Sequence, residues 1–170
     1  MLKNISQTLI PEFLRKNFGK ELFENLDQSQ HISVKGFAGS VPSILVAELF
    51  LTQKKDVLFI IDDKESSNYI TSELEEMIGE ENVLYFPETH LEPYQVEKTQ
   101  NANIVLRTEV LNRLNFDKKK KIIVATASSL SEKVLKKEDF KAISHTIKVG
   151  DQLDFDFTEE LLNQFNFNYT

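Results

Sequence analysis

The sequence predicts an α/β fold of the phosphate-loop type, a mainly parallel sheet with helices on both faces. From residue 31 onward, short apolar runs alternate with stretches of helical periodicity. Repeated strand–helix–strand units of this kind form right-handed crossovers between parallel strands. The run Val-Leu-Phe-Ile-Ile at residues 57–61 is apolar on both faces, which is typical of a central parallel strand. The glycine-containing residues 36–40 lie between the first expected strand and its helix, where phosphate loops lie.

Local patterning places each element. The strands are short apolar runs at residues 32–34, 57–61, 83–86 and 122–125. The helices carry apolar residues at helical spacing, at about residues 10–26, 44–50, 65–78 and 102–114. Thr126, Ser128 and Ser129 offer caps for a further short helix that ends near Leu135. Gly79 is placed to stop the helix before it, because glycine adopts positive φ at little cost.

The last part of the chain has a different pattern. Residues 145–149 are expected to form a strand, Gly150-Asp151 a turn and residues 157–165 a helix. Residues 165–170 alternate apolar and polar side chains with period two, which indicates the start of another strand. A strand that begins with nothing to pair against is a poor chain end. We therefore expect the chain to be a fragment of a longer protein.

Composition limits the class of protein. The chain has 170 residues, enough for one good hydrophobic core, and a formal net charge of −7. An acidic domain repels phosphate backbones unless a basic patch overcomes that field. The absence of cysteine excludes disulfides and cysteinate metal sites. No apolar stretch approaches the roughly 20 residues that span a bilayer, and no signal-peptide pattern opens the chain, so we expect a cytoplasmic protein without a membrane partner.

The glycine loop departs from the phosphate-binding pattern at the positions that hold phosphate. In G-x-x-x-x-G-K-[ST], glycine lets the backbone approach phosphate, lysine binds its charge and the hydroxyl binds magnesium. Here valine stands at the second glycine position, and proline at the lysine position removes both a charge and a backbone N–H. The residues of this degenerate loop are Gly36, Gly39, Ser40, Val41, Pro42 and Ser43. We expect no nucleotide or other cofactor, no metal and no catalytic residue in this chain. We expect it to keep the fold of a phosphate-loop domain and to act as a binding module.

Other catalytic patterns are incomplete. Gly36 and Gly39, with Asp62 after the next strand, offer part of a dinucleotide site, but the G-x-G-x-x-G fingerprint is absent. An acid after a buried strand is also common as a helix cap, so both interpretations of Asp62 stay open. The histidines lie in three separate segments without metal-ligand spacing, at His31, His90 and His145.

Runs of like charge are expected to be solvated. The glutamates within residues 73–76 and 80–81 are expected to form an exposed helix face and its end. The lysine run 118–121 is expected to be a solvated turn before the strand at 122–125. Contact with DNA through these lysines is the alternative, although no aromatic residue alternates with them to stack bases.

Several motifs follow one another between residues 30 and 170. They are the glycine loop, Val83-Leu84-Tyr85-Phe86-Pro87 with Leu91-Glu92-Pro93-Tyr94, Arg107 with Leu111-Asn112-Arg113-Leu114, residues 123–130, and Ile147-Lys148-Val149-Gly150-Asp151 with Leu161, Phe167 and Tyr169. In this order and spacing they resemble the UvrB-like N-terminal region of the bacterial transcription-repair coupling factors, the Mfd family. Asn166 stands where that family has a glycine, which is a departure from its pattern.

The resemblance implies a domain division and a partner. The helical pattern before residue 30 is expected to form a helix and linker at residues 1–30. The resemblance implies a RecA-like UvrB-homology domain at 31–143 and the truncated start of a small α+β UvrA-docking domain at 144–170. It implies a non-catalytic module that helps to recruit UvrA to stalled RNA polymerase for transcription-coupled nucleotide excision repair. ATP-driven DNA translocation and RNA polymerase binding would belong to later domains, and the UvrA contacts would lie beyond Thr170. The alternative is a nucleotide-binding lobe of an unrelated phosphate-loop or Rossmann-like enzyme.

Overall fold

The computed structural model describes residues 31–53, 55–89, 97–143, 149–150, 152, 154–155 and 158–159. Contacts divide the chain into two units, Met1–Lys133 and Val134–Thr170. The expected helix at 10–26 and the alternating residues at 165–170 lie outside the described residues, as do most of the expected elements between 144 and 165. The domain boundary expected at residues 143 and 144 stays a prediction.

A parallel sheet forms the centre of the first unit. It consists of β1 (Val57–Ile61), β2 (Val83–Phe86) and β3 (Ile122–Thr126) in the order β1-β3-β2. The connection from β1 to β2 passes over β3, and the connection from β2 to β3 returns in the opposite direction. Two crossovers of one hand that run in opposite directions place their helices on opposite faces of the sheet. The expected α/β character, with parallel strands and helices on both faces, is therefore confirmed.

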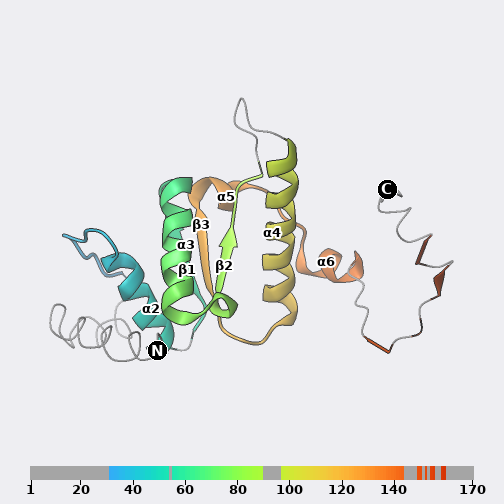
Figure 1. The fold of residues 1–170 in the computed structure, drawn as a ribbon, viewed down its shortest axis with the longest axis horizontal. Helices are drawn as coiled ribbons and strands as arrows, with labels where there is room; N and C mark the ends of the chain where they lie inside the picture. Colours follow the sequence, from blue (N-terminus) through green and yellow to red (C-terminus); the bar gives the residue numbers. More distant parts are fainter. Residues whose placement is uncertain are drawn as a thin grey trace. The chain divides into compact units, whose positions relative to one another are not determined.

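Two hydrophobic clusters separate the helices from the sheet. On one face, α2 (Val41–Gln53) and α3 (Lys64–Ile78) pack on the strands, and on the other α4 (Glu97–Phe116) covers β2 and β3. Figure 1 shows α3 and α4 on opposite sides of the strands. The first cluster contains Val46, Ala47, Phe50, Ile61, Leu74, Val83, Ile122 and Val124. The second contains Leu84, Phe86, Val110 and Ala125.

Helix α3 ends at the expected Gly79, and its N-cap is Asp63, the neighbour of the Asp62 considered as a cap from the sequence. The Asp63 carboxylate accepts hydrogen bonds from Ser66 N at 2.9 Å and Ser66 Oγ at 2.7 Å. These bonds lower the pKa of Asp63 below 3.8, so the stabilisation by the ionised cap is present above that pH and is lost as pH falls through the folded-state pKa. At the other end, Gly79 has φ +92° and its N–H donates to Glu75 O at 2.9 Å.

Helix α5 (Ala127–Ser131) also begins at an expected cap. Thr126 Oγ1 accepts from Ser129 N at 3.1 Å, and Ser129 Oγ lies 3.0 Å from Thr126 N, which completes a reciprocal capping box. The helix ends at Ser131 and does not reach residue 135 as expected. Helix α4 starts at Glu97, ahead of the expected residue 102.

Two expectations about strands are wrong. Residues 32–34 form no strand, and the side chains of Ile32 and Val34 are each 36% exposed. A strand needs a neighbour for its N–H and C=O groups, and no strand of the described part of the chain pairs with this segment. Strand β1 was expected to be central, but it lies at one edge of the described sheet.

The second unit contains α6 (Lys137–Ile143), which the sequence did not indicate. Glu138 and Asp139 lie in its first turn, where negative charge interacts favourably with the helix dipole. Gly150 has φ +100° in a turn with Val149, and Asp151, the other residue of the expected turn, lies outside the described residues.

We expect the Leu74→Ala variant to lose about 2–5 kcal/mol of unfolding free energy, because Leu74 is fully buried between α3 and the sheet. Tyr69→Ala on the same helix is the control, since Tyr69 is 62% exposed and its loss should change stability by no more than about 0.5 kcal/mol. Urea unfolding followed by circular dichroism measures both. Equal effects of the two substitutions would contradict this placement of the core.

Candidate functional site

The degenerate glycine loop leads directly into α2. Gly36 has φ +90° and Gly39 φ +57°, so both occupy conformations that glycine favours. Ser40 precedes the first helical residue, and Ile44 N donates to Ser40 O at 3.0 Å. Because the strand expected before this loop is absent from the described residues, only the loop and helix of a phosphate-loop unit are present.

The carboxylate of Glu73 accepts hydrogen bonds from the two serine hydroxyls of this loop. Ser43 Oγ donates to Glu73 Oε2 at 2.5 Å, and Ser40 Oγ donates to Glu73 Oε1. Ser43 stands at the magnesium-binding hydroxyl position of the phosphate-loop pattern, and its side chain is buried. A carboxylate also interacts favourably with the positive end of the α2 dipole. An approaching phosphate would therefore meet a negative charge and hydroxyls that already have an acceptor.

The expectation that residues 73–76 form a solvated face is wrong for Glu73. Its position on α3 could have indicated this, because Ile70, Leu74 and Met77 share the same helical face and pack in the core. The neighbouring Glu75 is also partly buried, and burial, followed by repulsion from Glu80, raises the pKa of its carboxyl group. The sequence could not show that Ser40 and Ser43 lie against Glu73.

A second polar cluster lies at the carboxyl ends of β2 and β3, the edge where open α/β sheets usually bind ligands. Its centre is Arg107 of α4, which is 6% exposed. Arg107 Nη1 donates to Pro87 O at 2.8 Å and to Ser129 O at 3.0 Å, and lies 3.5 Å from Glu132 Oε2. The guanidinium carbon also lies 3.9 Å from the centre of the Phe86 ring, a cation–π distance. One side chain thus joins α4 to the ends of both strands.

The surrounding groups complete this cluster. Glu132 Oε1 accepts from Thr89 N at 2.8 Å, and Glu88 Oε1 accepts from Thr126 Oγ1 at 2.6 Å. Burial lowers the pKa of Arg107, and the charge of Glu132 acts in the opposite direction. Within the described residues no buried side-chain nitrogen or oxygen lacks a hydrogen-bond partner. The polar groups at this edge are therefore used in holding the fold together.

The lysine run is only partly solvated. Lys121 is 3% exposed, and its Nζ donates to Glu81 O at 2.6 Å and lies 3.1 Å from Asp117 Oδ2. Lys120 Nζ lies 3.1 Å from Asp56 Oδ2. The expectation of a solvated turn is therefore wrong at Lys121, whose buried side chain holds the chain in place just before β3.

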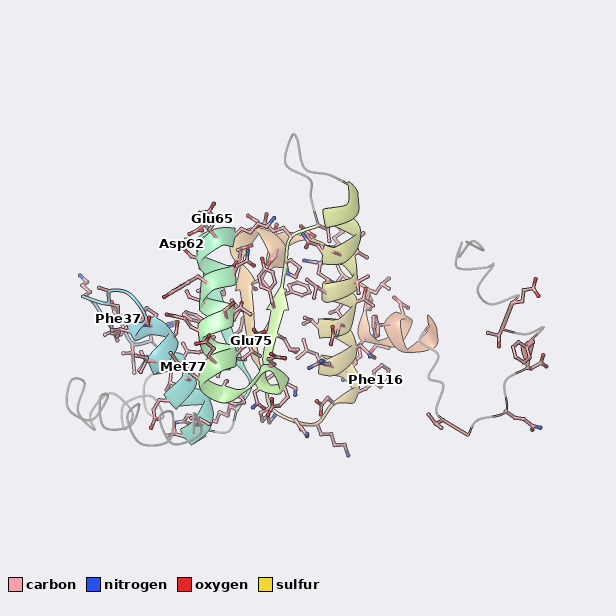
Figure 2. The ribbon with its side chains drawn as sticks, viewed as in Figure 1. Phe37, Asp62, Glu65, Glu75, Met77 and Phe116 are labelled. Carbon is pink, nitrogen blue, oxygen red and sulfur yellow. The ribbon has the colours of Figure 1, made fainter. Side chains whose placement is uncertain are left out.

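The remaining candidates are separate from one another. Asp62 lies at the beginning of α3 with Glu65, and Phe37 lies in the loop before α2 (Figure 2). Asp62 is exposed and the neighbouring Asp63 is the helix cap. His31 is exposed, whereas His90 and His145 lie outside the described residues. Across the described residues, no group of three or more His, Asp or Glu side chains could hold a metal ion. No helix in the same residues is long and apolar enough to cross a membrane.

Comparison of the chain with models of protein families, with curated proteins and with solved structures finds no match.

We expect Glu73→Ala to lower the unfolding free energy by about 1–3 kcal/mol, because it leaves the buried Ser43 hydroxyl without its acceptor. Glu76→Ala on the same helix is the matched control, since Glu76 is exposed. Denaturant unfolding of both variants measures the difference. If the two variants are equally stable, the contact between Glu73 and the glycine loop does not contribute to the fold.

We expect Arg107→Met to cost about 3–5 kcal/mol, because it leaves buried carbonyls and the Glu132 carboxylate without their cation. Arg113→Met is the control on the same helix, where an exposed i,i+4 pair with Glu109 is worth about 0.5 kcal/mol. Thermal and urea unfolding give both values. If Arg107→Met lowers the unfolding free energy by no more than Arg113→Met does, the buried contacts of Arg107 do not stabilise the fold.

Proposed function

We propose that this chain is a non-catalytic UvrB-like module of a transcription-repair coupling factor, which helps to recruit UvrA to stalled RNA polymerase. The single observation that carries its non-catalytic character is the glycine loop held by Glu73. ATP-driven translocation and contacts with DNA and RNA polymerase would belong to later domains of the longer protein. A RecA-like fold of residues 31–143 is part of the same proposal.

The loop supports binding without nucleotide chemistry. Val41 and Pro42 replace the glycine and the lysine that phosphate needs, and Glu73 supplies a negative charge in their place. Pro42 lies in the first turn of α2, where its missing N–H costs nothing. The helix is therefore kept while the phosphate-binding groups are lost.

The cluster around Arg107 supports the resemblance. Three segments that carry it, at residues 85–87, 107 and 123–130, lie far apart in the sequence. In the fold, Arg107 contacts Phe86 and Pro87 at the end of β2 and Ser129 in α5, which follows β3. A shared structural role explains why these residue types occur together in one chain.

The alternative, an enzyme lobe that binds a nucleotide, receives less support. Both the phosphate-loop and the dinucleotide-binding units place a strand directly before the glycine loop, and residues 31–38 form no regular structure. The groups at the carboxyl edge of β2 and β3 are bonded to one another.

The first test is a pull-down of UvrA by this chain and by a version extended by about 60 residues, enough to complete a small domain. We expect only the extended version to retain UvrA, because the docking contacts would lie beyond Thr170. The unextended chain is the matched control. If neither version retains UvrA, the proposed role is wrong.

A second measurement addresses the alternative. Calorimetric titration with ATP and magnesium is expected to show no binding at millimolar nucleotide, because the loop offers a carboxylate where phosphate requires a cation. Binding tighter than about 1 mM, which corresponds to roughly 4 kcal/mol, would favour the enzyme lobe instead.

A further inference from the structure

Helix α2 is apolar on the side that faces away from the core as well as on its core side. The buried core side has the i, i+3, i+4 and i+7 spacing of one helical face and contains Ser43, Val46, Ala47 and Phe50. The other side carries a row of apolar residues at four-residue spacing, here called the outer stripe: Val41, Leu45 and Leu49. All three are partly buried, and Glu48 is the one charged residue of the helix. A helix that is apolar all round is typical of a protein interior.

Helix α3 shows the ordinary pattern of a helix at the surface. It packs beside α2 on the same face of the sheet, and Leu74 on its core side is fully buried. Its exposed residues are polar apart from Tyr69: Glu65, Ser66, Asn68, Ser72 and Glu76. Helix α3 can therefore end the helical layer toward water, whereas the outer stripe of α2 calls for a further element to cover it.

We propose that residues 10–26 form a helix that packs on the outer stripe of α2. This segment lies outside the described residues, and its sequence predicts an amphipathic helix. It carries an apolar row with the same four-residue spacing: Ile10, Leu14, Phe18 and Leu22. Rows of residues four apart form ridges on a helix, and two such ridges interlock when the helix axes cross at about 50°. The two stripes therefore match in both chemistry and spacing.

The chain between the two helices is long enough for this contact. Residues 27–40 connect them, and at about 3.3 Å per residue this connection spans up to about 46 Å. The 13 residues of α2 extend about 20 Å. The proposed helix can therefore reach every part of the outer stripe, and both helices belong to the unit Met1–Lys133.

A tethered segment is a better occupant than a separate protein. A short flexible connection gives the attached helix an effective concentration on the order of millimolar, which a free partner helix has to exceed. Residues 1–30 then form part of the domain and are not a linker before it. The contact is independent of the function proposed above, so UvrA recruitment can fail while the helix still covers α2.

The exposed face of β1 is the other apolar surface that this helix could cover. Leu58 is 52% exposed and Ile60 is 53% exposed, on the face of the sheet where α4 covers β2 and β3. This surface offers two side chains on a strand and lacks the ridge of a helix with four-residue spacing. The connection at residues 27–40 also leads directly into α2. The outer stripe is therefore the better fit.

Thiol alkylation of the 170-residue chain tests the contact. The chain has no cysteine, so Leu45→Cys introduces a sole thiol on the outer stripe. We expect Phe18→Gln to raise the alkylation rate of this thiol at least about tenfold, because it removes apolar area from the covering helix. Lys16→Gln is the matched control, since residues two apart do not share a helical face, and it should leave the rate unchanged. Mass spectrometry follows alkylation, and circular dichroism confirms that each variant is folded.

Two outcomes of this experiment overturn the proposal. One is an alkylation rate of Leu45→Cys that is the same with Phe18 and with Phe18→Gln. The other is a rate that rises with Phe18→Gln at an Ile60→Cys thiol and not at Leu45→Cys, which would place the helix on β1.

Disulfide formation tests the same contact without disturbing the fold through Phe18→Gln. Leu45→Cys is combined in turn with Leu14→Cys, Phe18→Cys and Leu22→Cys, and we expect at least one pair to oxidise within a single chain, because packed ridges bring side chains into disulfide range. The same three substitutions combined with Tyr69→Cys are the control, since Tyr69 is 62% exposed on α3. Equal oxidation of the Leu45→Cys and Tyr69→Cys sets contradicts the contact. Disulfides that link two chains would assign the covering helix to a second copy and likewise overturn the proposal.

Discussion

The described fold depends on β3 and its parallel pairing with both neighbours. Among the described residues, β1 and β2 do not pair with each other, and each forms its strand hydrogen bonds with β3. Ile122, Val124 and Ala125 of β3 are fully buried because one hydrophobic cluster covers each face. Lys121 then fixes where the strand begins, and Thr126 fixes where it ends. The helices are arranged around this strand because an apolar parallel strand is stable only when both of its faces are covered.

Polar side chains at the positions where such a fold usually binds ligands form their contacts with other groups of the protein. Arg107 binds two main-chain carbonyls and the Glu132 carboxylate, and Glu73 accepts from both serines of the glycine loop. A buried cation or carboxylate without a partner would cost several kcal/mol, so each of these contacts constrains the elements it joins.

The two faces of the described sheet are covered unequally. Two helices cover one face, whereas α4 covers the other only over β2 and β3. Leu58 and Ile60 of β1 are therefore exposed, and no strand of the described residues pairs with the outer edge of β1.

The sequence by itself determined the strands at 57–61, 83–86 and 122–125 and the helices between them, because their periodicity is a local property. It also determined the stop at Gly79, which depends on the chain within a few residues. The tertiary structure alone decided that Glu73 accepts hydrogen bonds from Ser40, just before α2, and from Ser43 in α2, and that residues 32–34 form no strand. It also placed β1 at an edge of the sheet. These features depend on which segments become neighbours, and a one-dimensional pattern records which face is apolar but not what covers it.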